Sequence, residues 1–182
     1  MAKIAVIVGS ISADSLNRKL AKGLIRLAPP DLACEFVEIA PLPHYNHDFD
    51  DDPPSEAVKT FRESIKASDG ILFVTPEYNR SIPGVLKNAL DTGSRPYGQS
   101  VWRGKPAGVI GITPGASGTA MAQQHLRNVL ACLDMPTLGQ PEAYIQAREG
   151  LFNPDGSIGE ASREFLGKWM DAFAAWVRRL TV

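Results

Sequence analysis

The sequence alternates short, almost uninterrupted apolar runs with longer segments in which apolar residues recur at helical spacing. The runs are rich in Val and Ile, which is typical of strands buried on both faces. Strands that alternate with amphipathic helices form a parallel sheet covered on both faces, with right-handed crossovers between neighbouring strands. The pattern therefore predicts an α/β protein.

We expect strands at 4–8, 34–39, 70–75, 106–113 and 136–145, the last containing two prolines. We expect helices at 16–27, 55–67, 83–92, 117–133 and 165–180, and a long loop with four prolines and an acidic run at 41–54. Five strands fit the flavodoxin-like doubly wound order 2-1-3-4-5, with helices on both faces. No repeat or linker divides the 182 residues, so residues 1–182 are expected to form a single domain.

Composition excludes several classes of protein. Lys and Arg number 19 and Asp and Glu number 20, so the net charge of −1 argues against a nucleic-acid partner and against a strongly acidic electron-carrier surface. The two cysteines, Cys34 and Cys132, form no CxxC motif and suit a reducing compartment. The apolar N-terminal stretch is too short for a signal peptide or a membrane span, which favours the cytoplasm.

Three loops are candidates for a binding site, because strands 1, 3 and 4 are neighbours in this order and ligands bind beyond their carboxyl ends. The first loop, 9–19, carries Ser10, Ser15 and Asn17 and opens a helix, where free N–H groups and hydroxyls favour an anion. It matches neither GxGxxG nor GxxxxGK[ST], so a phosphomonoester bound without Mg²⁺ is the better hypothesis. The alternative is a serine-rich turn with an N-cap.

The second loop, 75–84, reads TPEYNRSIPG, in which Tyr78 could pack on a planar ligand and Asn79 or backbone groups could bond to its polar edge. The alternative is a capping turn fixed by its prolines. The third loop, 113–119, reads TPGASGT, and its glycines let the backbone approach a ligand. Its alternative is a flexible turn; a serine-hydrolase interpretation is weak because only His125 follows it.

A metal site is not favoured. The segment His44–Asp52 holds two histidines and four aspartates in a proline-bounded loop, without helical spacing of the histidines. The sixth position of an EF-hand counted from Asp48 would be Pro53 rather than glycine. A solvated acidic loop is therefore the preferred interpretation, and His125 is expected to be a core or interface residue.

Together, the three loops resemble the NAD(P)H-dependent FMN reductase family, which includes bacterial quinone and chromate reductases. The likeness covers nearly the whole chain, and one difference is Ser12, where members often carry Arg. The residues that carry it are Gly9-Ser10, Ser15 and Asn17, Leu42 to Asn46, Pro76-Glu77-Tyr78-Asn79, Ser81, Pro83-Gly84, Leu86 to Ala89, Asp91, Ser94-Arg95-Pro96, Gly104-Lys105-Pro106 and Pro114 to Gly118.

The resemblance implies a specific FMN site. Its phosphate would bind at Ser10, Ser15, Leu16 and Asn17. Its isoalloxazine ring would be bordered, largely through backbone groups, by Pro76, Glu77, Tyr78 and Asn79, with Ser81 nearby and Ser117 and Gly118 on the far side. The cofactor carries the chemistry, so no catalytic side chain and no metal are assigned.

The resemblance also implies an activity: NADPH or NADH reduces FMN, which then reduces a quinone, a flavin or another acceptor in a ping-pong cycle. Metal oxyanions and azo compounds are further candidate acceptors. The family implies a homodimer or homotetramer, with Arg127, Glu142 and Tyr144 at an interface. The alternatives are a flavodoxin-like electron carrier and a flavin-binding regulatory protein, neither of which would turn over NAD(P)H.

Overall fold

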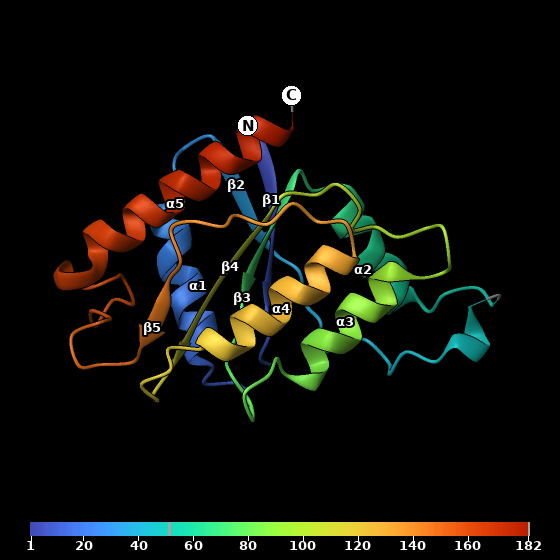
Figure 1. The fold of residues 1–182 in the computed structure, drawn as a ribbon, viewed down its shortest axis with the longest axis horizontal. Coiled ribbons are helices and arrows are strands. Elements are labelled where there is room, and N and C mark those ends of the chain that lie inside the picture. Colours follow the sequence, from blue (N-terminus) through green and yellow to red (C-terminus); the bar gives the residue numbers. More distant parts are fainter. Residues whose placement is uncertain (51, 182) are drawn as a thin grey trace.

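A computed structural model describes residues 1–50 and 52–181. Within these residues, a five-stranded parallel sheet has the order β2-β1-β3-β4-β5, so the predicted flavodoxin-like fold is confirmed (Figure 1). The strands are β1 (Ala2–Val8), β2 (Leu32–Phe36), β3 (Gly70–Val74), β4 (Ala107–Thr113) and β5 (Tyr144–Gln146). The helices are α1 (Leu16–Leu27), α2 (Glu56–Lys66), α3 (Gly84–Ser94), α4 (Ala120–Cys132) and α5 (Glu160–Leu180), with a short 3-10 helix, η1 (His47–Phe49).

Helices cover both faces of the sheet, as the apolar runs predict. Side chains alternate along β1: Ile4, Val6 and Val8 pack in a cluster with α1 and α5, whereas Ala5 and Ile7 pack in a cluster with α2, α3 and α4. In Figure 1, α1 and α5 lie on one side of the strands and α3 and α4 on the other. None of the described helices combines the length and the apolar character that crossing a membrane requires.

Two strand predictions were wrong in their bounds. The second strand spans Leu32–Phe36 rather than 34–39. The fifth spans only Tyr144–Gln146, because Thr137 pairs with β4 through an isolated bridge and Pro136 and Pro141 have no N–H to donate to a ladder. The other strands, and α1, lie close to their predicted ranges, and the predicted loop at 41–54 also contains η1.

The register leaves one end of β4 projecting beyond its neighbour. β3 pairs with β4 from Ile71–Ala107 to Val74–Ile110, whereas β4 continues to Thr113 and pairs there with β5. The backbone groups of Ile112 therefore point toward a position that β3 no longer occupies. This position lies at the carboxyl edge of the sheet, where a doubly wound fold binds its ligands.

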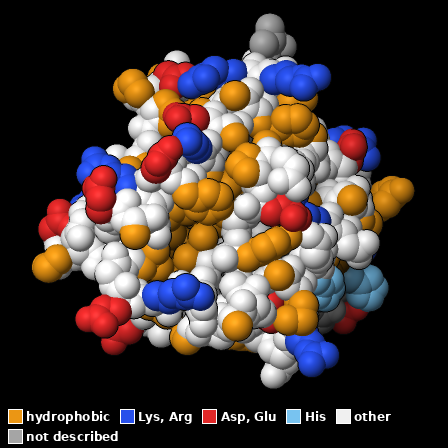
Figure 2. Space-filling model, turned by 60° about the vertical axis from the view of Figure 1, so that its left-hand side comes forward, with side chains coloured by type: hydrophobic (Ala, Val, Ile, Leu, Met, Phe, Trp, Pro, Cys, Tyr) orange, Lys and Arg blue, Asp and Glu red, His pale blue; other side chains and the backbone are white. Residues whose placement is uncertain are grey.

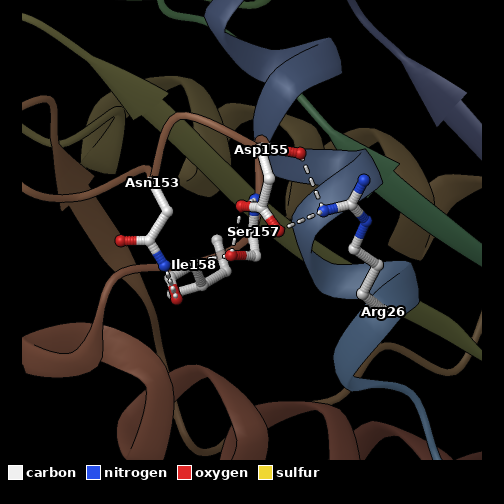
Figure 3. A network of polar contacts seen from close by, with 5 residues as sticks. All are labelled: Arg26, Asn153, Asp155, Ser157 and Ile158. Atoms are coloured by element: carbon white, nitrogen blue, oxygen red, sulfur yellow. Dashed lines mark hydrogen bonds and ion pairs between the residues drawn. The ribbon is translucent and has the colours of Figure 1, made fainter.

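A polar network joins the end of α1 to the segment before α5 (Figure 3). Arg26 donates to the carbonyl oxygen of Asp155 at 2.9 Å, and Asn153 donates to Ser157 and Ile158. Hydrogen bonds from Ser157, and to a smaller extent the charge of Arg26, lower the pKa of the Asp155 carboxyl. The network holds the connection from β5 to α5 against α1.

The contact between Gly93 and Trp102 yields a stability prediction with a matched control. A Cβ at Gly93 in α3 would lie 2.5 Å from two atoms of the fully buried indole of Trp102, which is itself bonded to Leu90. Gly93→Ala should therefore lower the free energy of unfolding by about 1–3 kcal/mol. Gly167→Ala in α5, where a Cβ meets nothing within 4 Å, should raise it by about 1 kcal/mol. Denaturant titration measures both, and equal effects would contradict the packing argument.

Candidate functional site

The three predicted loops meet at the carboxyl edge of the sheet, the lower edge in Figure 1. The Gly9 N–H donates to the Val74 carbonyl at 2.9 Å, and the Thr75 N–H donates to the Ile110 carbonyl at 3.0 Å. A Cβ at Gly9 would lie 2.7 Å from Thr75 Oγ1, so glycine is needed for the first loop to approach the second. Three loops that are far apart in the sequence thus form one continuous edge.

The first loop forms a cradle of hydroxyls and free N–H groups at the start of α1. Ser15 is the N-cap, and its hydroxyl accepts from the Arg18 N–H at 3.2 Å. The N–H groups of Leu16 and Asn17 have no partner within a helix, because they belong to its first turn. Ser10 and Ser15 are buried, and no acidic residue stands in the described first turn of α1. Free N–H groups, hydroxyls and the positive end of the helix dipole can together hold an anionic group.

The side chain of Asn17 has a partner that the sequence did not reveal. Its amide nitrogen donates to the Ile112 carbonyl at 2.9 Å, and its amide oxygen accepts from the Ile112 N–H at 3.0 Å. Asn17 is 3% exposed and takes the place that a further residue of β3 would have taken beside β4. The side chain is therefore committed to the sheet, and only the backbone N–H of Asn17 faces the cradle as a free donor.

The second loop contains a two-residue hairpin turn. Tyr78 and Ser81 exchange backbone hydrogen bonds of 2.9 and 3.0 Å, and Asn79 and Arg80 between them have φ angles of 51° and 64°. Two successive positive φ angles are the signature of a type I′ turn. The turn leaves Tyr78 53% exposed, so its ring is available to a planar ligand.

Two hydrogen bonds attach this loop to α4. Glu77 accepts from the Ala122 N–H at 3.1 Å in the first turn of α4, and Ser81 Oγ lies 2.6 Å from His125 Nδ1. The N-cap residue Thr119 makes no side-chain capping bond in the described structure, so Glu77 supplies the cap from another loop. Sequence reasoning missed these roles, because no local spacing relates residues that lie about forty-five positions apart.

The third loop rests on β5. Gly118 has a φ of 55°, and a Cβ there would lie 2.6 Å from the carbonyl carbon of Tyr144. Gly118 therefore allows the third loop to approach β5 closely. Ser117 is half-buried, and its carbonyl accepts from the Ala120 N–H at the start of α4.

The residues expected at an interface lie on α4 and beside β5. Arg127 donates to the Leu138 carbonyl at 2.6 Å, and Gln124 donates to Glu142 at 3.0 Å and to the Tyr144 hydroxyl at 3.2 Å. Burial raises the pKa of Tyr144, and the hydrogen bond with Glu142 raises it further.

Figure 2 shows one face of the molecule, where hydrophobic side chains gather across the middle and many of the charged ones lie toward the margin.

The acidic loop, residues 44–52, and a neighbouring cavity lie beside α2 and α3. His47 Nδ1 lies 3.1 Å from the Asp48 carboxylate, whereas Asp51 falls outside the described residues. A cavity of about 550 Å³ lies between this loop, α2 and the end of α3. Its buried Arg62 donates to the carbonyls of Thr92, Gly93, Arg95 and Gln99, so the guanidinium caps the carboxyl end of α3. Burial lowers the pKa of Arg62.

Known proteins are similar to this chain in sequence and in fold. A family model described as NADPH-dependent FMN reductase matches residues 2–149. A 2-hydroxy-1,4-benzoquinone reductase of a Burkholderia species is 54% identical over 177 residues, covering 97% of this chain and 96% of the relative. A quinone reductase of Pseudomonas putida is 51% identical over 175 residues, covering 96% of this chain and 94% of the relative.

A solved structure is similar over its full length. FerB, described as a flavoenzyme NAD(P)H:(acceptor) oxidoreductase from Paracoccus denitrificans, superposes with a TM-score of 0.95 at 45% identity, and the match covers 100% of both chains. The family model, the two relatives and the solved structure are all described as reductases or oxidoreductases. The chain belongs to the NADPH-dependent FMN reductase family and, as its sequence predicted, it is an oxidoreductase that uses FMN and NAD(P)H.

Proposed function

We propose that this chain binds FMN along the edge formed by its three loops and passes electrons from NADPH or NADH to quinones. The observation that carries the proposal is the meeting of a buried, serine-lined helix start with an exposed Tyr78 hairpin at one edge of the sheet. Such an edge offers an anion site and a planar surface side by side. The names of the similar reductases support quinones as the acceptor class.

The FMN phosphate would bind at the start of α1. The N–H groups of Leu16 and Asn17 and the hydroxyls of Ser10 and Ser15 would donate to its oxygens. The helix N-terminus would add about 0.3–2 kcal/mol, toward the upper end where the site is partly buried. A hydroxyl can donate and accept at once, so Ser15 can cap α1 and bind the phosphate together.

The flavin ring would lie between the second and third loops. Pro76, Tyr78 and Asn79 would border it, with Ser81 nearby and Ser117 and Gly118 on the far side. Glu77 would contribute through its backbone, because its carboxylate is bonded to α4. When bound, FMN supplies the acceptance of hydride from NAD(P)H and its delivery to a second substrate. The protein's part is to orient the ring and to leave one face open to both substrates in turn.

Several further properties belong to the same proposal. Residues 1–182 would act as a single FMN-binding domain and assemble as a homodimer or homotetramer, with Arg127, Glu142 and Tyr144 at an interface. Flavins, metal oxyanions and azo compounds would be additional acceptors. The cytoplasm suits the two free cysteines, because its reducing conditions keep thiols unpaired. Burial raises the pKa of Cys34 to about 11, which makes its thiol unreactive.

The function is tested by cofactor content and turnover. The purified protein should be yellow, release FMN on denaturation and oxidise NADPH or NADH when a benzoquinone is added. Protein that takes up no added FMN would contradict the proposal. Protein that binds FMN but oxidises neither nicotinamide would instead support an electron carrier or a regulatory flavoprotein.

The phosphate cradle is tested by two matched serines. Ser15 and Ser55 are both N-caps whose hydroxyls accept a backbone N–H, at 3.2 and 3.5 Å, so replacing either by alanine should cost about 1 kcal/mol of stability. Only Ser15→Ala should weaken FMN binding, by at least about tenfold, because a hydrogen bond to a charged group contributes about 1.5–3 kcal/mol. Fluorescence titration measures this, and equal affinities of the two variants would refute the cradle.

Asn17 is expected to matter chiefly for stability of the edge. Asn17→Ala leaves a buried N–H and a buried carbonyl without partners, which should lower the free energy of unfolding by about 2–5 kcal/mol and weaken FMN binding as a consequence. Asn88→Ala is the control, since its amide also bonds a donor and an acceptor of another segment, Tyr45 and Pro43, and neither partner belongs to the three loops. Asn88→Ala should leave FMN affinity unchanged. Unaltered thermal stability of Asn17→Ala would show that the paired bonds are unimportant.

A further inference from the structure

The hairpin of the second loop has an unfavourable backbone conformation for its sequence. Asn79 and Arg80 both have positive φ angles, 51° and 64°. Asparagine tolerates this region, whereas Arg80 carries a Cβ that disfavours it, and type I′ turns prefer Asn-Gly at these two positions. Both residues are exposed, so packing around them does not hold the turn. Something outside the turn must favour this conformation.

The hairpin is fastened to α4 at both ends. Glu77 precedes the turn and accepts from the Ala122 N–H at 3.1 Å, and Ser81 follows it with Oγ 2.6 Å from His125 Nδ1. The Ala122 N–H is a donor of the first turn of α4 and His125 lies three residues further along, so both attachments are within the first two turns of that helix. α4 is a firm support, because its Leu126 and Leu130 are fully buried in the core.

We propose that His125 is a positioning residue, which holds the strained hairpin through Ser81 and so fixes the surface that Tyr78 and Asn79 present. The His125 side chain is exposed on α4, and its hydrogen bond to Ser81 is the contact through which it reaches the second loop. The inference rests on the proposed function only where it concerns the flavin. The attachment of the hairpin to α4 through Ser81 and His125, here called the clamp, needs no ligand.

Side chains of different reach test the clamp. Asparagine at position 125 places a polar atom where Nδ1 lies and keeps the bond to Ser81, whereas glutamine reaches to the position of Nε2 and alanine reaches neither. His125→Ala and His125→Gln should weaken FMN binding about fivefold to tenfold, which corresponds to the loss of one hydrogen bond. They should also shift the flavin absorption bands. His125→Asn should match the wild type, as should Asn128→Ala, an exposed control on the same helix.

A second substitution should relieve the strain that His125 counters. Arg80→Gly converts the turn to Asn-Gly, which adopts the type I′ conformation without help. Arg80→Gly in the His125→Ala protein should restore FMN affinity and the absorption bands to within about twofold of the wild type. If His125 stabilised only α4, a glycine at position 80 in the second loop could not compensate for its loss.

Hydrogen exchange of the FMN-free protein separates the clamp from the flavin. The N–H groups of Tyr78 and Ser81 each donate to the other residue's carbonyl across the turn, so they should exchange faster in His125→Ala and recover in the double variant. Unchanged exchange in His125→Ala would overturn the inference whether or not FMN binds. Faster exchange with no FMN binding in any protein would retain the clamp and refute the proposed function.

Discussion

The amide of Asn17 holds together the edge on which the rest of this structure depends. β4 continues past the end of β3, and Asn17 supplies the donor and the acceptor that Ile112 would otherwise lack in the buried interior. One side chain thereby fixes α1 to β4 across the place where β3 stops. The contact joins the first loop, which contains Asn17, to the end of β4, where the third loop begins, so the spacing of the two loops follows from it. Loss of the Asn17–Ile112 contact would lower the stability of the fold strongly, because it would leave buried backbone groups without hydrogen-bond partners.

The second loop depends on a different kind of support. Its hairpin combines an exposed aromatic ring with a backbone conformation that arginine disfavours, and α4 holds it through Glu77 and Ser81. Binding surfaces on loops are precise only when rigid elements position them. The fold thus places an irregular segment on a regular one, and in the proposed mechanism the flavin ring would be oriented by that arrangement.

In an FMN- and NAD(P)H-dependent oxidoreductase the cofactor performs the redox chemistry, and the protein contributes binding, alignment and access. The three loops offer hydroxyls, backbone N–H groups and an aromatic ring, which are groups that bind and orient. Near-neutral net charge accords with small-molecule partners, which need no long-range steering by a surface of one sign.

The sequence by itself determined the strands, the helices between them and the three loops, because periodicity and turn residues are local signals. The strand order followed from the five-stranded doubly wound fold that this pattern fits. The FMN reductase family followed from the motifs of those loops. The tertiary structure alone decided the short fifth strand, the commitment of Asn17 to Ile112, the orientation of Gly118 toward Tyr144, and the bonds of Glu77 and Ser81 to α4. These are contacts between segments far apart in the chain, and no local pattern specifies which distant donor meets which acceptor.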